Sequence, residues 1–328
     1  MMDKATVIGK NLTVGYTKRK QKKEILRDLS FALNSGEMTC LLGPNGVGKS
    51  TLVKAILGQI KPWSGSVFLN GKEIASYTNE DLSKELSVVL TEPFLPGNMT
   101  VGQLVAMGRI PHTSWTGKLS EADLKAVEKA LVATKITYLK DERLAEISDG
   151  QRQKAMIARA LAQDGKVMVL DEPTAHLDLV NRFEIMRLLH EISRSQQKAI
   201  LVVTHDLEIA LETADRFWLL NCGSPLISGL PEDLVISGSI NQLLPGKQFH
   251  FSVDRGRIES VESDVKFDFS GPVELVQWVR NALLKAGVKN LKSTIEVCGN
   301  PLLMKYEGQN FESVGELVEG LKRREVHL

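Results

Sequence analysis

The most informative part of this sequence is Gly43-Pro44-Asn45-Gly46-Val47-Gly48-Lys49-Ser50-Thr51. It follows the pattern G-x-x-x-x-G-K-S and lies between an apolar run at residues 38–42 and a helical pattern at residues 52–57. Glycines let the backbone curl so that successive N–H groups point at one anion, and the positive end of the following helix strengthens the attraction. The Lys49 ammonium can neutralise phosphate charge, and the Ser50 hydroxyl can ligate Mg²⁺. The sequence therefore predicts a phosphate-binding loop between a strand and a helix.

The composition is that of a globular protein, and the length favours about two domains. The chain has 328 residues, 43% apolar and 25% charged, and its formal net charge of +1 gives no global field for binding nucleic acid. It has no run of about 18 apolar residues, and its first residues lack the apolar core of a signal peptide. Its three cysteines, Cys40, Cys222 and Cys298, stand far apart, which favours reduced thiols. We therefore expect a cytoplasmic protein.

Two features precede the phosphate-binding loop. The run Lys18-Arg19-Lys20-Gln21-Lys22-Lys23 could contact anionic lipid or nucleic acid, but we interpret it as a solvated loop because it is short and flanked by strand patterns. Tyr16 lies just before this run. An aromatic ring in this position can stack on adenine, since every base has a π-face, although a packed strand residue would look the same.

Two apolar strands further along the chain end in residues that suit phosphate chemistry. Residues 167–170 are followed by Asp171 and Glu172, and residues 199–203 are followed by Thr204 and His205. Ligands bind at the carboxyl edge of open parallel sheets. At that edge one acid can hold Mg²⁺, and its neighbour can orient or deprotonate an attacking water. We include His205 because it ends a core strand beside the strand that carries the acids.

The segment between the first strands and the acidic strand is predicted to be helical. Capping patterns at Thr100-x-x-Gln103 and Ser120-x-x-Asp123 place a helical insertion at about residues 93–163. Ser148 and Gln151 form a third such pattern before an alanine-rich helix. Pro245-Gly246 marks a boundary, and residues 246–328 show short strand patterns and two amphipathic helical patterns. We therefore expect a first domain at residues 1–245 and a small C-terminal α+β domain at residues 246–328, of unknown role.

In this order and spacing, the motifs resemble those of an ATP-binding-cassette (ABC) ATPase over about residues 4–245. The resemblance implies an α/β fold: a mixed-sheet core with a phosphate-binding loop, an antiparallel β subdomain and the helical insertion. It implies ATP and Mg²⁺ as cofactors, with Lys49, Glu172 and His205 as catalytic residues and Ser50, Asp171 and Glu92 near the metal. The nucleotide-binding residues that it implies are Tyr16, Gly43, Pro44, Asn45, Gly46, Val47, Gly48, Lys49, Ser50, Thr51, Glu92, Ser148, Gly150, Gln151 and Asp178.

The chain departs from the family pattern at two positions. The signature motif usually has two consecutive glycines, but here Asp149 replaces the first, while Ser148 and Gly150 remain to meet the nucleotide. The Q-loop usually places a glutamine after the strand that ends at Leu90, but this chain has Glu92. We expect the first change to be tolerated. The second brings an extra negative charge near the γ-phosphate and leaves the coupling to transport open.

More narrowly, the chain resembles the ATPase subunits of importers for iron–siderophore, haem or cobalamin. This resemblance rests on residues 104–112, LVAMGRIPH, and on residues 173–178, PTAHLD. It implies a head-to-tail homodimer with two ATP molecules between the subunits, in which Glu172 is the general base and His205 contacts the γ-phosphate. It also implies a separate membrane permease, a substrate-binding protein and a location on the inner face of the cell membrane.

Two alternative functions fit the same ATP-binding motifs. A soluble ABC ATPase for cytosolic assembly, such as iron–sulfur cluster building, would have the same ATP chemistry and differ in what docks on residues 93–118. A nucleotide-gated binding module would bind ATP and hydrolyse little of it because of the altered Q-loop. The transported substrate is not encoded in this chain, because its selectivity would lie in other chains.

Overall fold

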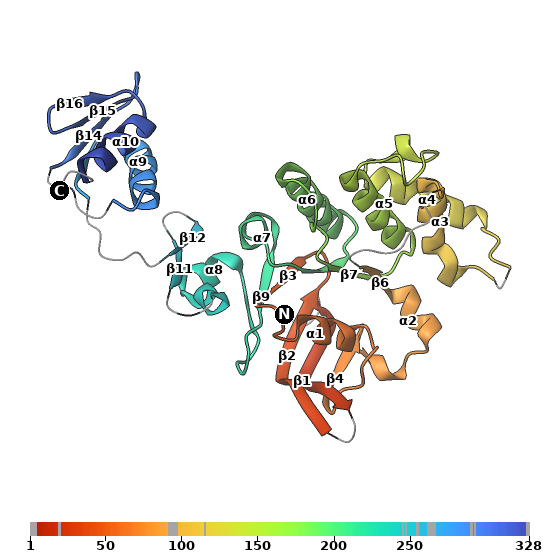
Figure 1. The fold of residues 1–328 in the computed structure, drawn as a ribbon. Helices are drawn as coiled ribbons and strands as arrows, with labels where there is room; N and C mark the ends of the chain where they lie inside the picture. Colours follow the sequence, from red (N-terminus) through yellow and green to blue (C-terminus); the bar gives the residue numbers. More distant parts are fainter. Residues whose placement is uncertain are drawn as a thin grey trace. The chain divides into compact units, whose positions relative to one another are not determined.

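The computed structural model describes residues 5–18, 21–90, 98–114, 116–244, 246, 248–253, 256–260, 267–288, 291 and 293–325. The chain forms two compact units, Met1–Glu259 and Ser260–Leu328 (Figure 1). We expected the domain boundary between residues 245 and 246, but the structure divides the chain later, between Glu259 and Ser260. The reason is the hairpin of β11 (Phe249–Ser252) and β12 (Arg257–Ser260), because Phe251 packs into the core of the first unit.

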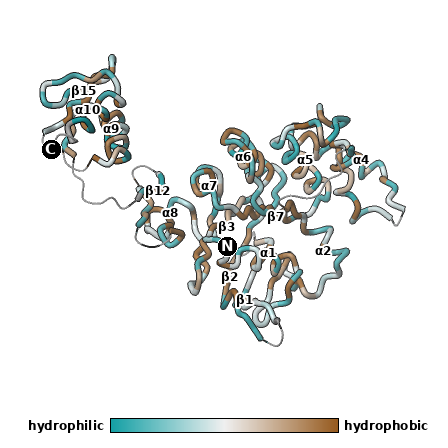
Figure 2. Tube along the Cα trace, in the orientation of Figure 1, coloured by the Kyte–Doolittle hydropathy of each residue, from teal (hydrophilic) through white to brown (hydrophobic). Residues whose placement is uncertain are grey.

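A six-stranded sheet forms the centre of the first unit. Its strand order is β10-β9-β3-β8-β7-β6, and all neighbours whose register is described are parallel except β10 and β9. The residues of β3 and β8 are all buried, as expected for apolar strands covered on both faces. Figure 2 shows the hydrophobic colour along β3 and along the neighbouring central strand β7. The strands are β3 (Met38–Leu42), β6 (Leu86–Val89), β7 (Val167–Asp171), β8 (Ala199–Val203), β9 (Arg216–Leu219) and β10 (Ile227–Gly229).

Helices flank this sheet. An apolar core on one side includes residues of α6 and α7, and a second core on the other side includes residues of α1. These helices and their neighbours are α1 (Lys49–Ile56), α6 (Leu179–Ser195), α7 (Leu207–Thr213), α8 (Pro231–Ile236) and the short 3₁₀ helix η4 (Ser239–Leu243). The predicted strand–loop–helix order around the phosphate-binding loop is present.

An antiparallel sheet packs with α1 in the second core. Its strand order is β2-β1-β4-β5, and Leu12 of β1 and Leu29 of β2 are buried there beside Leu52 of α1. The elements are β1 (Ala5–Lys18), β2 (Gln21–Asn34), β4 (Ser64–Leu69), β5 (Lys72–Glu73) and η1 (Ile74–Ser76). This is the antiparallel β subdomain that the resemblance implied.

A helical segment lies between β6 and β7, as predicted. Its capping boxes begin α3, α4 and α5, each with the side-chain and backbone hydrogen bonds expected from the sequence. The helices of this segment are α3 (Val101–Ala106), η2 (Met107–His112), α4 (Glu121–Ala133), η3 (Thr137–Leu139) and α5 (Asp149–Ala162), and the short helix α2 (Asn79–Glu85) comes just before β6. In the part of the chain that the structure describes, no helix is long and apolar enough to cross a membrane.

The second unit has a core of its own. Its sheet, in the order β13-β14-β15-β16, buries Ile295, Val297 and Met304 against Leu283 of α9 and Leu317 of α10. The predicted α+β character is therefore confirmed, although β16 had no signal that we identified in the sequence. The elements are β13 (Phe269–Ser270), α9 (Val273–Lys285), β14 (Ile295–Cys298), β15 (Leu303–Tyr306), β16 (Gln309–Phe311) and α10 (Val314–Glu325).

Candidate nucleotide-binding site

The phosphate-binding loop connects β3 to α1, and its glycines are required by geometry. Gly48 caps α1 with φ 113°, a left-handed conformation that side chains disfavour. A Cβ on Gly43 would lie 2.4 Å from the carbonyl oxygen of Leu220, so no other residue fits there without movement of the backbone. The loop residues Pro44, Asn45 and Gly46 are exposed, whereas Val47 is buried. The loop is thus anchored at both ends and open between them.

Lys49 is drawn into the loop. Its Nζ donates hydrogen bonds to the carbonyl oxygens of Gly43 (2.6 Å) and Pro44 (3.1 Å), and the residue is 9% exposed. Burial lowers the pKa of Lys49, while the nearby carboxylates of Glu172 and Asp171 raise it in part. The side chain therefore places a cation at the mouth of a loop of backbone N–H groups, as the motif predicts.

Three strand ends meet at one edge of the central sheet. Asp171, the last residue of β7, is paired with Val203, the last residue of β8, and Leu41 of β3 is paired with the same Val203. The phosphate-binding loop, Asp171 and His205 therefore leave neighbouring strands at the same edge. Burial raises the pKa of Asp171, the Glu172 carboxylate raises it further, and the Lys49 ammonium lowers it.

Glu172 and His205 are hydrogen-bonded to each other. His205 Nδ1 lies 2.9 Å from Glu172 Oε2, and the Glu172 backbone N–H donates to the carbonyl oxygen of Val203. The Glu172 side chain is 23% exposed and that of His205 is 71% exposed. Glu172 has φ 49°, an uncommon conformation for a residue with a side chain. The two side chains thus form a carboxylate–imidazole pair that solvent reaches from the histidine side.

Tyr16 is joined to the start of α1. Its hydroxyl oxygen lies 3.3 Å from Thr51 Oγ1, and the residue is 42% exposed. Ser50 is exposed beside the buried Thr51. The ring is neither buried nor remote from the loop, which fits the predicted stacking position better than that of a packed strand residue.

The signature residues begin helix α5 in the helical segment. Ser148 Oγ accepts from the Gln151 backbone N–H at 3.3 Å, and Gln151 Oε1 accepts from the Ser148 backbone N–H at 2.9 Å. Asp149 is the first residue of α5 and pairs with Arg152 at 2.8 Å, so its carboxylate lies at the positive end of the helix. An aspartate in place of the usual glycine is therefore accommodated locally.

Asn181 is a residue that the sequence analysis missed. A Cβ on Gly150 would lie 2.6 Å from Asn181 Oδ1, and Asn181 Nδ2 donates to Asp178 Oδ2 at 2.6 Å. Asp178 also caps α6 by accepting from the Asn181 backbone N–H. The pair thus connects the loop before α6 to the signature motif. The spacing of three residues from a capping aspartate was the signal that could have identified it.

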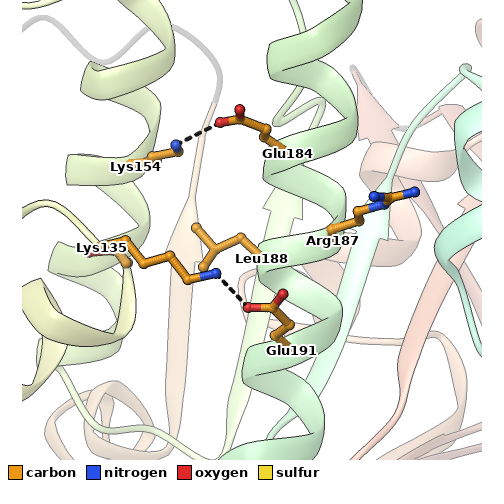
Figure 3. A pocket seen from close by; sticks show the side chains of 7 residues that line it. Lys135, Lys154, Glu184, Arg187, Leu188 and Glu191 are labelled. Carbon is orange, nitrogen blue, oxygen red and sulfur yellow. Dashed lines mark hydrogen bonds and ion pairs between the residues drawn. The ribbon is translucent and has the colours of Figure 1, made fainter.

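The helical segment is also joined to α6 by two ion pairs. Lys154 of α5 pairs with Glu184 at 2.8 Å, and Lys135 pairs with Glu191 at 2.9 Å (Figure 3). They lie beside a cavity of about 320 Å³ that none of the predicted site residues lines. The predicted site residue Glu92 lies outside the described residues, so the structure does not place it.

Comparisons with known proteins point to one family. The sequence profile of the ABC transporter family matches residues 26–175. An uncharacterized ABC transporter ATP-binding protein of Methanocaldococcus jannaschii is 41% identical over 78% of this chain and 87% of its own length. The ferric enterobactin transport ATP-binding protein of Escherichia coli is 35% identical, over 73% of this chain and 87% of its length.

A solved structure extends the likeness to the fold. A metal-chelate type ABC transporter in an inward-facing conformation matches 74% of this chain and 89% of its own chain, with a TM-score of 0.62 and 29% identity. The predicted ABC cassette fold is therefore confirmed. The chain belongs to the ABC transporter family as one of its ATPases.

Proposed function

We propose that this chain powers an importer of iron chelates, such as an iron–siderophore complex, through a separate membrane permease on whose cytoplasmic side it sits. The relatives support the substrate class: similar proteins are named for the transport of ferric enterobactin, achromobactin, petrobactin and iron(3+)-hydroxamate. The observation that carries the chemistry is the Glu172–His205 pair at 2.9 Å, on the sheet edge that also bears Lys49.

The residues at that edge have distinct roles in the reaction. The backbone of residues 43–49 and the Lys49 ammonium hold the phosphates of ATP, and Tyr16 stacks on the adenine. The hydroxyl of Ser50 and the carboxylate of Asp171 are oxygen donors, the kind that Mg²⁺ takes together with phosphate. When bound there, Mg²⁺ would neutralise charge on the phosphates.

Glu172 accepts the proton of the attacking water, or orients that water, for in-line attack on the γ-phosphate. His205 contacts the γ-phosphate from the solvent side and keeps the Glu172 carboxylate in place through its Nδ1. Hydrolysis removes the phosphate that His205 contacts, so the pair senses the state of the nucleotide.

A head-to-tail dimer would complete the site. Among the described residues, Ser148 bonds to Gln151 of its own helix, and Gly150 lies beside Asn181. Ser148 is exposed at the N-terminus of α5. A helix N-terminus with outward N–H groups attracts an anion. In a dimer of two copies, Ser148 and Gly150 of one subunit would face the ATP held by Lys49 of the other. Relatives include a solved dimeric ABC cassette.

An uptake assay tests the proposed function. Cells that lack this chain should lose uptake of the radioactive iron–siderophore complex, and the wild-type gene should restore it. Glu172→Gln should not restore it. Glu212→Gln, which changes an exposed glutamate on α7, is the matched control and should restore uptake fully. Normal iron uptake without the chain, with ATP hydrolysis by the purified protein intact, would show that the substrate class is wrong.

A further inference from the structure

The β1–β2 hairpin has two distinct faces near the nucleotide site. Across its strands Tyr16 is paired with Lys23, and Thr17 is paired with Lys22. Directly paired residues of an antiparallel hairpin project from the same face, and successive residues of one strand project from opposite faces. Tyr16 and Lys23 therefore share one face, whereas Thr17 and Lys22 share the other.

Trp63 identifies the face that points away from the site. A Cβ on Gly15 would lie 2.8 Å from Trp63 Cη2, so the indole covers the face of Gly15, which is also the face of Thr17. Lys22 Nζ lies 5.5 Å from the centroid of the Trp63 ring, in a cation–π contact on that same side. Lys22 is thus engaged on the outer face of the hairpin.

The opposite face overhangs the phosphate-binding loop. Tyr16 reaches Thr51 in the first turn of α1 through its hydroxyl, at 3.3 Å. A Cβ on Gly48 would lie 2.8 Å from Leu26 Cδ2 and 2.9 Å from Ile25 Cγ2, so β2 passes close above the loop just after Lys23. Lys23 is exposed. The register therefore places a long, flexible cationic side chain on the Tyr16 face, beside the loop that holds phosphate.

We propose that Lys23 is a nucleotide-contacting residue whose ammonium pairs with the α-phosphate of ATP or ADP. The proposal rests on the proposed nucleotide site, in which adenine stacks on Tyr16. The phosphate nearest to the base is the α-phosphate, whereas the γ-phosphate lies toward Glu172 and His205 at the sheet edge. Lys23 thereby adds a second cation to the site, at the opposite end of the triphosphate from the hydrolytic residues.

Equilibrium binding to the purified full-length chain tests this, with Mg²⁺, ADP and a non-hydrolysable ATP analogue. Lys23→Ala should weaken binding of both nucleotides by about 2- to 5-fold, the upper part of the range for an exposed charge pair. Lys22→Ala removes the same charge one residue away on the outer face and should change the affinity by less than about twofold. Lys23→Arg should restore most of the affinity, and thermal unfolding should show all variants folded.

Each other outcome is informative. Equal losses of nucleotide affinity for Lys22→Ala and Lys23→Ala would mean that only the general positive charge of the hairpin acts. The proposed contact between Lys23 and the α-phosphate would then be refuted. An effect on the ATP analogue but not on ADP would place Lys23 at the γ-phosphate, which also overturns the proposal. If Tyr16→Ala weakens binding and Lys23→Ala does not, the inference fails while the nucleotide site stands. If the wild-type chain binds neither nucleotide, the proposed site itself fails.

Discussion

At the scale of single residues, the site depends on side chains that reach each other from different strands. Glu172 follows β7 and His205 follows β8, and the parallel pairing of these strands brings Nδ1 and Oε2 to 2.9 Å. Lys49 is held by its own loop rather than by the acids, because its Nζ donates to the carbonyl oxygens of Gly43 and Pro44. Phosphate oxygens would compete for those same donors, so the loop can exchange its internal hydrogen bonds for a ligand.

The first prediction concerns Glu172. Glu172→Gln keeps the shape of the side chain but removes the proton acceptor, so steady-state ATP hydrolysis should fall by about 10² or more. ATP binding should survive because the phosphate-binding loop is unchanged, and ATP should therefore trap a dimer. The measurements are phosphate release and size-exclusion chromatography with and without ATP. A monomer only, with ATP bound, would contradict the sandwich arrangement or the assignment of the base.

At the scale of secondary-structure elements, the helical segment is held by caps and by a buried ion pair. Arg109 Nε donates to Asp123 Oδ1 at 2.8 Å, and Arg109 Nη1 donates to the carbonyl oxygen of Ala162 at the end of α5. Arg109 is 8% exposed and Asp123 is 5% exposed. Asp123 also accepts from Ser120, the cap of α4. One carboxylate therefore connects η2, α4 and, through the guanidinium, α5.

The second prediction follows from the pKa of Asp123, which is lowered to about 2 by hydrogen bonds from Ser120 and then by Arg109. Because the folded pKa lies below the unfolded value of about 3.9, the contribution to stability is complete above about pH 4 and is lost as the pH falls toward 2. Asp123→Asn should therefore lower the unfolding temperature at pH 7 and lose less further stability between pH 4 and 2. Asp141→Asn, at an exposed position, is the control. Parallel pH profiles for Asp123→Asn and wild type would contradict this.

The third prediction concerns the cap of α5. Ser148→Ala removes the oxygen that accepts from the Gln151 backbone N–H, which should cost about 1 kcal/mol of stability. If Ser148 also meets the ATP of a second subunit, the same change made in the Glu172→Gln background should abolish the ATP-trapped dimer. Ser120→Ala removes a comparable cap from α4 and should leave the dimer intact. Equal dimer formation by both variants would limit Ser148 to its capping role.

At the scale of the whole molecule, the chain consists of two units, each with its own apolar core. The first contains every described residue of the proposed site. The hairpin of β11 and β12 is part of this unit because Phe251 is 5% exposed and its backbone N–H donates to Asn241 Oδ1 at 2.7 Å. The division of the chain therefore follows packing rather than the Pro-Gly pair.

The fourth prediction tests this boundary by truncation. A chain that ends at Glu259 should fold and bind ATP, because it retains the sheet, the site and the core that includes Phe251. A chain that ends at residue 245 should bind ATP but unfold at a lower temperature, since losing a buried phenylalanine costs about 3–5 kcal/mol. The measurements are thermal unfolding and ATP binding of both. Equal unfolding temperatures would show that the hairpin contributes nothing to the first core.

Features that depend only on neighbouring residues could be predicted without the structure. The phosphate-binding loop, the capping boxes of α3, α4 and α5, the acids after β7 and the histidine after β8 could all be predicted. Each is encoded within a few residues by glycine conformation, cap spacing or an apolar run. The ABC fold could be predicted as well, because these motifs occur in the order and at the spacing typical of the family.

Which of these residues come into contact became known from the three-dimensional arrangement of the elements. The Glu172–His205 hydrogen bond, the link between Asn181 and the signature motif, and the face of the hairpin that carries Lys23 all depend on the register and order of strands far apart in the sequence. The domain boundary depends on where Phe251 is buried. Local patterns cannot encode such contacts, because they arise from the packing of elements around a shared core, and a shift of one residue in register would turn every side chain to the other face.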